Sequence, residues 1–420
     1  MKIRKVLAVP GLNGFYNDDK AAIKAGAVQD GFVYRGKPVT PGFKTIRQAG
    51  ECASIVLLMD DGSHAFGDAL SVQYSASGGR EGMHSGEELA RLALAALAPA
   101  LEGQVVSSFR DMTAALDELA LDGAPLPASL AYGCSQAILD AVALAKRLTP
   151  AEVIASEYGL EMSASPIRIN SQSGDDRYVN VDKMILKKAG FMPHGLLNNA
   201  RDKVGLSGEK LLAYAQWVRD RIVDLGEPGY APTLRFDVYG TIGEVFGNDT
   251  DRVAGYLAEL YRVTRPFDLF VEMPVDMGDS AQQMRAMRAI REKLARRATP
   301  VKLIIDEYAN TLEEIRLWAD SGACDMIQVK TPDLGSLHKT VEAVLHCKTS
   351  GVLAYLGGSC TDTDQSARLC ANIALATEPF AVCAKPGMGV DEAMMIVNNE
   401  MRRVLQIAHA RKRLQGATLS

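Results

Sequence analysis

Four short apolar runs in the middle of the chain each end in a charged residue, with amphipathic helical patterns between them. The runs end at Asp237, Glu272, Asp306 and Lys330. Such runs are typical of buried parallel strands, and their alternation with helices indicates a parallel sheet or a barrel. In a barrel, the carboxyl ends of all strands meet at one mouth. The sequence therefore predicts that three carboxylates and one lysine lie together.

The three carboxylates predict a site for a hard divalent cation. Carboxylate oxygens with room for water suit Mg2+ better than Zn2+, and no cysteine–histidine cluster follows the strands. Lys330 is a candidate base, because a nearby cation and burial both lower the pKa of a lysine. A metal and a lysine together fit removal of a proton from a carbon next to a carboxylate. The alternative is that each acid caps the following helix or faces solvent.

From about residue 165 onward, strand-like and helical patterns alternate. The candidate strands cover residues 166–172, 184–188, 233–237, 268–272, 302–306, 326–330, 352–356 and 380–384. We therefore expect an α/β fold in which residues 161–420 form a (β/α)8 barrel that ends in a long helix over 390–414. An open, doubly wound sheet is the alternative, but no strand is followed by a Gly-rich dinucleotide fingerprint.

Residues 1–160 are expected to form a separate α+β capping domain. Residues 54–59, an Asp-Gly turn and an extended run to Val72 predict a β-hairpin. An apolar, Ala-rich stretch near 129–148 predicts a buried helix. The polar loop 77–80 either closes over the barrel mouth as a lid or is an exposed loop of a packing domain.

The overall composition of the chain limits its possible binding partners and its cellular compartment. The net charge is −5 and no long run of one sign occurs, which argues against a nucleic-acid or anionic-membrane partner. The seven cysteines form no C-x-x-C pair, so free thiols in a reducing cytoplasm are expected. No stretch approaches the apolar length of a membrane span, and the apolar run before Pro10 is too short for a signal peptide.

Further polar residues stand at or just past the ends of other candidate strands: Gln172, His194, Gln328, Ser359, Cys360 and Cys383. Gln328 faces the same side of its strand as Lys330, because it lies two positions earlier. His194 is either structural or catalytic. Cys360 is either a nucleophile with His194 as its base, or part of a small loop that donates hydrogen bonds to a substrate carboxylate; we favour the second role.

Several longer motifs point to a known family. They cover residues 39–43 with 47–52, 172–178, 182–185, 237–243, 330–335 and 384–389. On these motifs the chain resembles the methylaspartate ammonia-lyase family of the enolase superfamily over essentially its whole length. The pairing of a lysine base with Mg2+ is a documented feature of that superfamily.

The resemblance implies elimination of ammonia from (2S,3S)-3-methylaspartate, a small amino-dicarboxylate, to give mesaconate, with Mg2+ and often K+. It implies that Asp237, Glu272 and Asp306 bind the metal, that Lys330 removes the proton at carbon 3, and that His194 serves the opposite face. It also implies a homodimer. The residues that it implies for substrate contact are Gln73, Gln172, Gln328, Ser359 and Cys360.

The chain departs from the family pattern near the expected methyl pocket. Asn170 stands where the family has Phe, Cys383 where it has Leu, and Ser359 where it has Thr. A lost methyl contact is worth about 1 kcal/mol, so discrimination is expected to relax roughly tenfold or to shift towards another substituted aspartate.

Two further departures are Thr361 in place of Asn and Met273 in place of Gly.

Two other functions remain open on the sequence. One is a different enolate reaction of the superfamily, such as an epimerase, cycloisomerase or dehydratase. Many of those carry Lys-x-Lys at the second strand end, whereas Lys187 and Lys188 are adjacent here. The other is a non-catalytic protein that binds a dicarboxylate, which would have no use for both Lys330 and His194.

Overall fold

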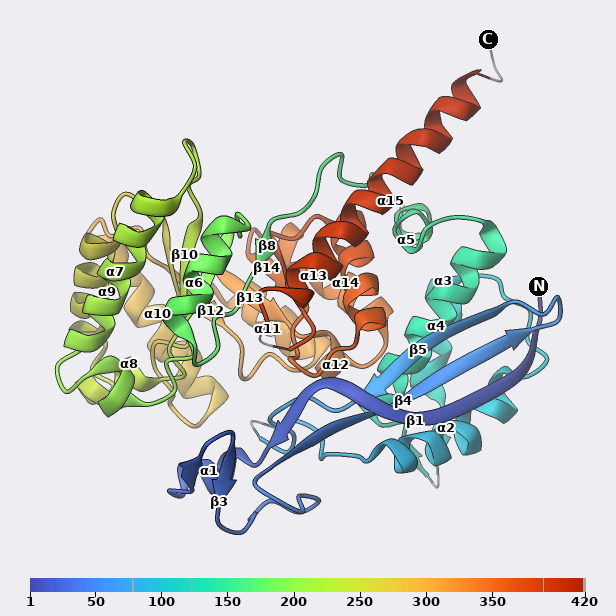
Figure 1. Ribbon diagram of the computed structural model, residues 1–420, viewed down its shortest axis with the longest axis horizontal. Coiled ribbons are helices and arrows are strands. Elements are labelled where there is room, and N and C mark those ends of the chain that lie inside the picture. Colours follow the sequence, from blue (N-terminus) through green and yellow to red (C-terminus); the bar gives the residue numbers. More distant parts are fainter. Residues whose placement is uncertain (78, 122, 388, 418–420) are drawn as a thin grey trace.

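The computed structural model describes residues 1–77, 79–121, 123–387 and 389–417, and its centre is a closed barrel of parallel strands (Figure 1). The order around the barrel is β10 (Thr233–Asp237), β11 (Leu269–Glu272), β12 (Lys302–Ile305), β13 (Met326–Val329), β14 (Leu353–Leu356), β15 (Ala381–Cys383), β8 (Ile169–Asn170) and β9 (Phe191–His194). The predicted barrel is confirmed, and the open-sheet alternative is wrong. Gly78 and Met388, which belong to two of the sequence motifs, lie outside the described residues.

The second barrel strand is not where the sequence predicted it. Residues 184–188 end helix α6 (Arg177–Leu186), and the strand is β9. Within α6, Val181, Met184 and Ile185 are buried while Leu186 is 71% exposed, which is the i, i+3, i+4 spacing of a helix face. Lys187 and Lys188 therefore do not stand at a strand end.

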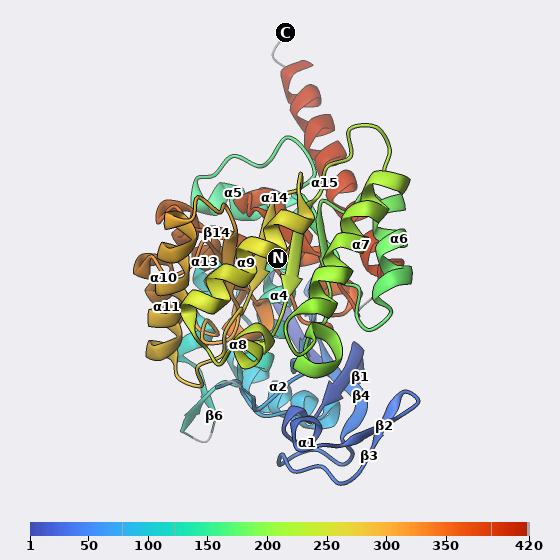
Figure 2. The ribbon, with the colours of Figure 1, turned by 90° about the vertical axis from the view of Figure 1, so that its left-hand side faces the viewer.

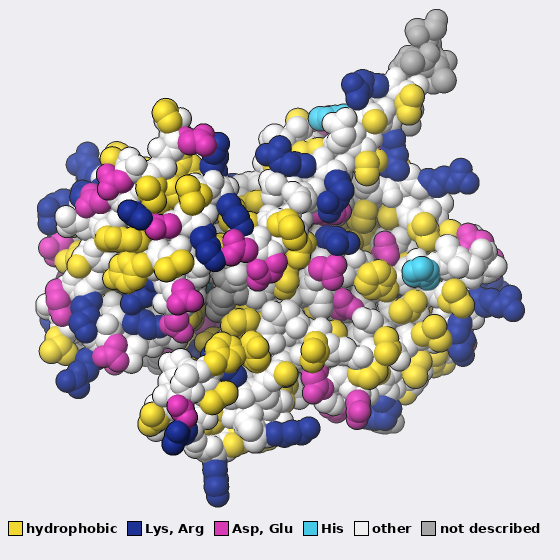
Figure 3. Space-filling view, viewed as in Figure 1, with side chains coloured by type: hydrophobic (Ala, Val, Ile, Leu, Met, Phe, Trp, Pro, Cys, Tyr) yellow, Lys and Arg dark blue, Asp and Glu magenta, His cyan; other side chains and the backbone are white. Residues whose placement is uncertain are grey.

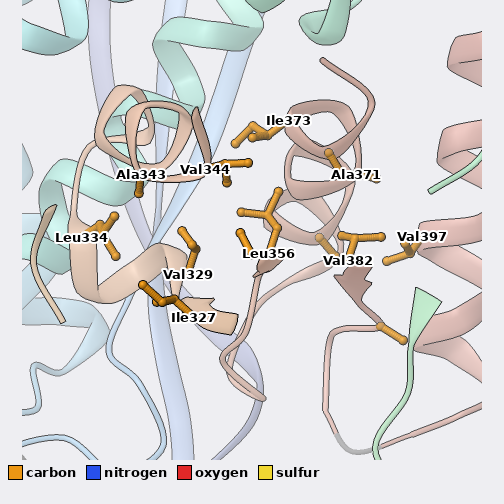
Figure 4. Packing of buried hydrophobic residues seen from close by; sticks show 14 of the residues in the cluster. Ile327, Val329, Leu334, Ala343, Val344, Leu356, Ala371, Ile373, Val382 and Val397 are labelled. Atoms are coloured by element: carbon orange, nitrogen blue, oxygen red, sulfur yellow. The ribbon is translucent and has the colours of Figure 1, made fainter. Parts of the chain in front are cut away.

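Helices surround the barrel strands and bury their outward-facing side chains. Figure 4 shows Ile327, Val329, Leu356 and Val382 from the strands packed towards Val344 and other apolar residues of the helices. The helices are α7 (Glu209–Leu225), α8 (Thr241–Phe246), α9 (Thr250–Thr264), α10 (Ser280–Arg296), α11 (Leu312–Ser321), α12 (Thr331–Leu334), α13 (Leu337–Thr349) and α14 (Asp364–Thr377). A π-helical turn, Ala200–Val204, precedes α7. The capping box predicted at Thr311 and Glu314 is confirmed.

The last helix, α15 (Glu392–Ala417), is the long C-terminal helix that the sequence predicted. It packs on α14 at its start and then extends beyond the rest of the molecule (Figures 1 and 2). On the face drawn in Figure 3, basic and acidic side chains are interspersed rather than segregated.

The N-terminal part is a three-stranded antiparallel sheet beside the barrel (Figure 2). Its strands are β1 (Ile3–Asp18), β4 (Arg47–Met59) and β5 (His64–Leu70), and the predicted hairpin between β4 and β5 is confirmed. Its helices are α1 (Lys20–Lys24), α2 (Gly86–Leu101), α3 (Phe109–Ala114), α4 (Ala128–Lys146) and α5 (Pro150–Tyr158), with a 3-10 turn, Ala115–Glu118. Two short hairpins pair β2 (Val28–Asp30) with β3 (Val33–Arg35) and β6 (Ala120–Leu121) with β7 (Ala124–Pro125).

The expectation that no stretch approaches the apolar length of a membrane span is wrong at helix α4. Among the described residues, this helix is long and apolar enough to cross a membrane by length and composition. However, 78% of its apolar window is buried inside the molecule, because it packs against β5 on one side and contacts α12 and α13 of the barrel on the other. It is therefore a core helix that joins the N-terminal sheet to the barrel.

The contact of α4 with β5 depends on glycine. A Cβ atom added at Gly133 would lie 2.3 Å from the backbone nitrogen of Ala69. A Cβ added at Gly67 would lie 2.3 Å from the carbonyl oxygen of Gly133. Backbone meets backbone here, so neither partner can move aside as a flexible side chain would.

We predict that Gly133→Ala lowers the free energy of unfolding by about 1–3 kcal/mol or more, because the added methyl overpacks the α4–β5 contact. The matched control is Gly255→Ala in helix α9, where an added Cβ meets nothing within 4 Å. That change should stabilise the protein by about 0.5–1 kcal/mol through helix propensity. Thermal unfolding followed by circular dichroism measures both, and equal effects at the two positions would contradict the close contact.

Candidate active site

A small cavity of about 60 Å³ opens at the carboxyl ends of the barrel strands. It is lined by these residues from the sequence predictions: Gln73, Gln172, His194, Asp237, Asp306, Gln328, Lys330, Ser359 and Cys360. Glu272, Asn170 and Cys383 do not line it and lie buried beneath it. The cavity's size and polar lining suit a small polar molecule.

The three acidic residues stand on adjoining strands. Asp237 and Glu272 are direct neighbours across the β10–β11 pair, and Asp306 follows β12. Each carboxylate faces its own basic side chain. Asp237 Oδ2 lies 3.1 Å from His194 Nε2, and Asp306 Oδ1 lies 2.8 Å from Lys330 Nζ. Glu272 is bound by the buried guanidinium of Arg235.

Burial and mutual repulsion set the charges of these acids. Burial raises the pKa of Glu272 well above its usual value, and the charges of Asp237 and Asp306 raise it further. Burial likewise raises the pKa of Asp237. For Asp306, Lys330 and Arg80 outweigh burial and lower its pKa. The three acids therefore interact electrostatically with one another.

The acidic set fits a hard divalent cation. Its donors are carboxylate oxygens only, which are the ligands that Mg2+ takes from proteins, and added positive charge would relieve the repulsion among them. No group of three His, Cys, Asp or Glu side chains in the described part of the chain already surrounds one point as a metal cage. Each of the three carboxylates instead contacts its own basic side chain, namely His194, Arg235 or Lys330.

Two basic groups face the cavity from opposite sides of the barrel. Lys330 follows β13, and His194 ends β9, which lies four strands away around the ring of eight. The His194 Nδ1 accepts a hydrogen bond from the backbone of Leu196 (3.3 Å), which places the ring proton on Nε2, towards Asp237. Burial, with the charges of nearby cations, lowers the pKa of His194 well below its usual value.

The pKa of Lys330 is raised, whereas the sequence analysis expected it to be lowered. Burial and the neighbouring Arg80 disfavour its charged form, but the acids around it outweigh both and raise the pKa of Lys330. Those acids are Asp306, Asp333 and Glu307. The sequence argument considered a cation beside Lys330 and did not count these three carboxylates.

The N-terminal part supplies Val72, Gln73, Tyr74 and Arg80 to the lining of the barrel cavity. Gln73 follows β5, and its amide nitrogen donates to Asp18 Oδ2 at 3.0 Å. Arg80 reaches from the loop that the sequence suggested as a lid; its side chain is 3% exposed and donates to Asp333 Oδ2 at 2.8 Å. Sequence analysis missed Arg80, although it is the one charged residue of the Gly-rich loop 77–80.

Polar side chains, none of them acidic, line the other side of the mouth. Gln172 follows β8, and Ser359 and Cys360 follow β14. Lys385, which follows β15, donates to Gln172 Oε1 at 2.8 Å and to Cys360 Sγ at 3.4 Å. The sequence analysis included Lys385 in a motif but gave it no role.

Arg235 forms the floor between the cavity and the barrel core. Its guanidinium donates to Tyr355 Oη at 2.7 Å, in addition to Glu272. The Asn170 amide, oriented to satisfy its neighbours, accepts from Arg235 Nη1 at 2.9 Å, and it lies 3.2 Å from Cys383 Sγ. The two departures from the family pattern thus adjoin Arg235 and not the cavity itself. Arg235 was detectable from the sequence, because it lies two positions before Asp237 and faces the same side of the strand.

Comparisons with known proteins agree with this arrangement. Family models described as the N-terminus and the C-terminus of methylaspartate ammonia-lyase match residues 1–159 and 161–410. The chain belongs to the methylaspartate ammonia-lyase family. It is 48% identical to methylaspartate ammonia-lyase 2 of Carboxydothermus hydrogenoformans, over 98% of this chain and 99% of that protein.

Solved structures of the family superpose closely. The crystal structure of Citrobacter amalonaticus methylaspartate ammonia lyase containing (2S,3S)-3-methylaspartic acid matches with a TM-score of 0.96 at 45% identity, covering 97% of this chain and all of that one. The Mg complex of beta-methylaspartase from Clostridium tetanomorphum matches with a TM-score of 0.94 at 46% identity, covering 98% of this chain and 100% of that one. The family inferred from the motifs is confirmed.

We predict that Arg80 and Asp333 are energetically coupled, so that the ion pair fixes the N-terminal loop on the barrel. Arg80→Met should cost about 3–5 kcal/mol, because it leaves the buried Asp333 without its ion-pair partner. Asp333→Asn should cost less, because Arg80 keeps its contact with Asp306 at 3.5 Å. The double variant should cost less than the sum by about 1–3 kcal/mol.

Urea unfolding of the unaltered protein, the two single variants and the double variant measures the coupling. The control is the exposed pair Arg35–Asp30 (2.7 Å), for which a coupling below about 1 kcal/mol is expected. Additive effects at Arg80 and Asp333 would contradict the anchor.

Proposed function

We propose that this protein is a Mg2+-dependent carbon–nitrogen lyase that eliminates ammonia from (2S,3S)-3-methylaspartate to give mesaconate. The observation that carries the proposal is the pair of bases, Lys330 and His194, on opposite sides of a cavity that three carboxylates adjoin. Membership of the methylaspartate ammonia-lyase family supports the same reaction.

In this proposal Lys330 takes the proton from carbon 3 of the substrate, and His194 faces the opposite side of that carbon. Asp306 holds the Lys330 ammonium after the transfer, since its oxygens lie 2.8 and 2.9 Å away. When held by Asp237, Glu272 and Asp306, Mg2+ supplies Lewis-acid stabilisation of the developing carboxylate charge and offsets the acids that favour protonated Lys330. The substrate-binding residues are Gln73, Gln172, Gln328, Ser359 and Cys360.

Asn170 and Cys383, which the sequence placed near the substrate's methyl group, act in this proposal by setting the position of Arg235 at the cavity floor. A second candidate follows from that floor: the same elimination from an aspartate whose substituent at carbon 3 is polar. A guanidinium at the floor favours a hydrogen-bonding group over a methyl group.

The remaining expectations are part of the same proposal. We propose K+ as a monovalent activator, a homodimer, a cytoplasmic location, and a division into domains at residues 1–160 and 161–420. The family resemblance supports the first two, the unpaired cysteines support the third, and the separate matches to residues 1–159 and 161–410 support the last. The interspersed charges on the face in Figure 3 fit a small-molecule substrate better than a nucleic acid or an anionic membrane.

The proposal predicts a rise in ultraviolet absorbance when the protein and Mg2+ are mixed with (2S,3S)-3-methylaspartate, because the product is an unsaturated dicarboxylate. EDTA should stop the rise, and excess Mg2+ should restore it. Parallel assays use aspartate and an aspartate with a polar group at carbon 3. A higher kcat/KM for the polar analogue favours the second candidate, and no rise with any of them contradicts both.

The assignment of the two bases predicts opposite stereochemical losses. Lys330→Ala should lower turnover of the (2S,3S) isomer by about 10²–10⁴-fold while sparing the (2S,3R) isomer, and His194→Ala should do the reverse. Calorimetric titration with Mg2+ checks that each variant still binds the metal. Equal losses on both isomers, or none, would refute the assignment.

A further inference from the structure

Four cationic side chains line the cavity, and one of them differs from the rest. Arg80, Arg235 and Lys330 each contact at least one carboxylate. Lys385 is 1% exposed and contacts only the neutral Gln172 amide and the Cys360 thiol. It makes no ion pair with any Asp or Glu in the described ranges of the chain.

A buried ammonium without a counter-charge is costly, because removing the ion from water is offset only by a nearby anion. The closest candidate acid is Asp362, whose charge interacts with Lys385, but the two groups form no ion pair. Asp362 itself is bound by Tyr132 and Ser366. The charge of Asp362 therefore offsets the cost at Lys385 only in part, because the two groups form no ion pair in the described structure. The Lys385 side chain lines the cavity that a ligand would fill.

The position of Lys385 in the barrel indicates which chemical group of the ligand lies beside it. Lys385 follows β15 and Gln172 follows β8, and these strands lie four positions around the ring from β11 and β12. Those opposite strands carry Glu272 and lead to Asp306, so the mouth has an acidic side and, across from it, a cationic side. A dicarboxylate of four carbons in its main chain can span the cavity with one carboxylate on each side.

We infer that Lys385 binds the substrate carboxylate on the amino-bearing carbon, an assignment that rests on the proposed function. The proton that Lys330 removes lies next to the other carboxylate, whose developing charge needs the acidic, metal-binding side. The remaining carboxylate then faces Lys385. Lys385 also donates to Gln172 Oε1, which turns the amide nitrogen of Gln172 outward as a second donor for the same carboxylate.

The test compares two substrates: (2S,3S)-3-methylaspartate and its analogue in which the carboxylate on the amino-bearing carbon is a primary amide. In the unaltered enzyme, kcat/KM should be about 100-fold higher for the dicarboxylate, because a charge-assisted hydrogen bond is lost with the amide. In Lys385→Met this preference should fall to a few-fold, since the variant loses activity on the dicarboxylate only. Lys385→Arg should keep part of the preference.

Stability separates substrate binding from a structural role. Because Lys385→Met removes an unpaired buried charge, the thermal midpoint should stay level or rise, as is common where function requires a strained group. The control variant is Lys187→Met, a lysine that does not line the cavity and binds Asp391 and the backbone of Val390, and its activity should not change. A lower midpoint with equal activity losses on both substrates would overturn the assignment, and so would an unchanged preference.

A different result identifies a failure of the proposed function itself. If the unaltered enzyme turns over neither substrate, calorimetric binding of mesaconate and of its two monoamides, with Mg2+ present, replaces the rate assay. A roughly 100-fold weaker binding of one monoamide that disappears in Lys385→Met would support the carboxylate site without the reaction. Equal binding of mesaconate and both monoamides would refute it.

Discussion

The burial of many charges at one barrel mouth is the constraint on which this structure depends. Each buried ion costs free energy unless an opposite charge lies beside it, and apart from Lys385 the buried Lys and Arg side chains of the mouth are paired with acids. Arg235 faces Glu272, Lys330 faces Asp306, and Arg80 faces Asp333. These pairs join strands β10 to β13 and the N-terminal loop into one polar layer, and this layer determines which ligands the cavity accepts.

The N-terminal part contributes to this layer as well as to the core. Gln73 and Arg80 enter the cavity from the segment after β5, and the close backbone contact at Gly133 fixes where β5 lies. Helix α4 links the position of β5 to the barrel, because it packs against β5 and also contacts α12. Helix α12 directly follows Lys330. A change in the α4–β5 contact therefore shifts cavity side chains that lie far from it in sequence.

Most of the barrel was predictable because its strands are apolar runs with a charged residue at the end, as at Asp237 and Glu272. The second strand was not, since Pro193 interrupts the apolar pattern of β9, and Met184 and Ile185 satisfy both a strand run and a helix face. The sequence also did not predict which side chains form ion pairs or hydrogen bonds with one another. The contacts of Arg80 with Asp333 and of Lys385 with Gln172 join residues that are 253 and 213 positions apart, and only the fold brings them together.

Arg235 explains one departure from the family pattern, Asn170. A buried guanidinium needs acceptors on every side, and here Glu272, Tyr355 Oη and the Asn170 oxygen provide them. A phenylalanine at position 170 would remove one acceptor and leave an unpaired N–H, at a cost of about 1–3 kcal/mol. Asn170 is thus required by its neighbour Arg235. This polar floor contrasts with the apolar methyl pocket that the family resemblance implies. In the proposed function, the acids and bases of the mouth carry out the reaction and the floor contacts the substituent, so different layers of the same barrel set the two.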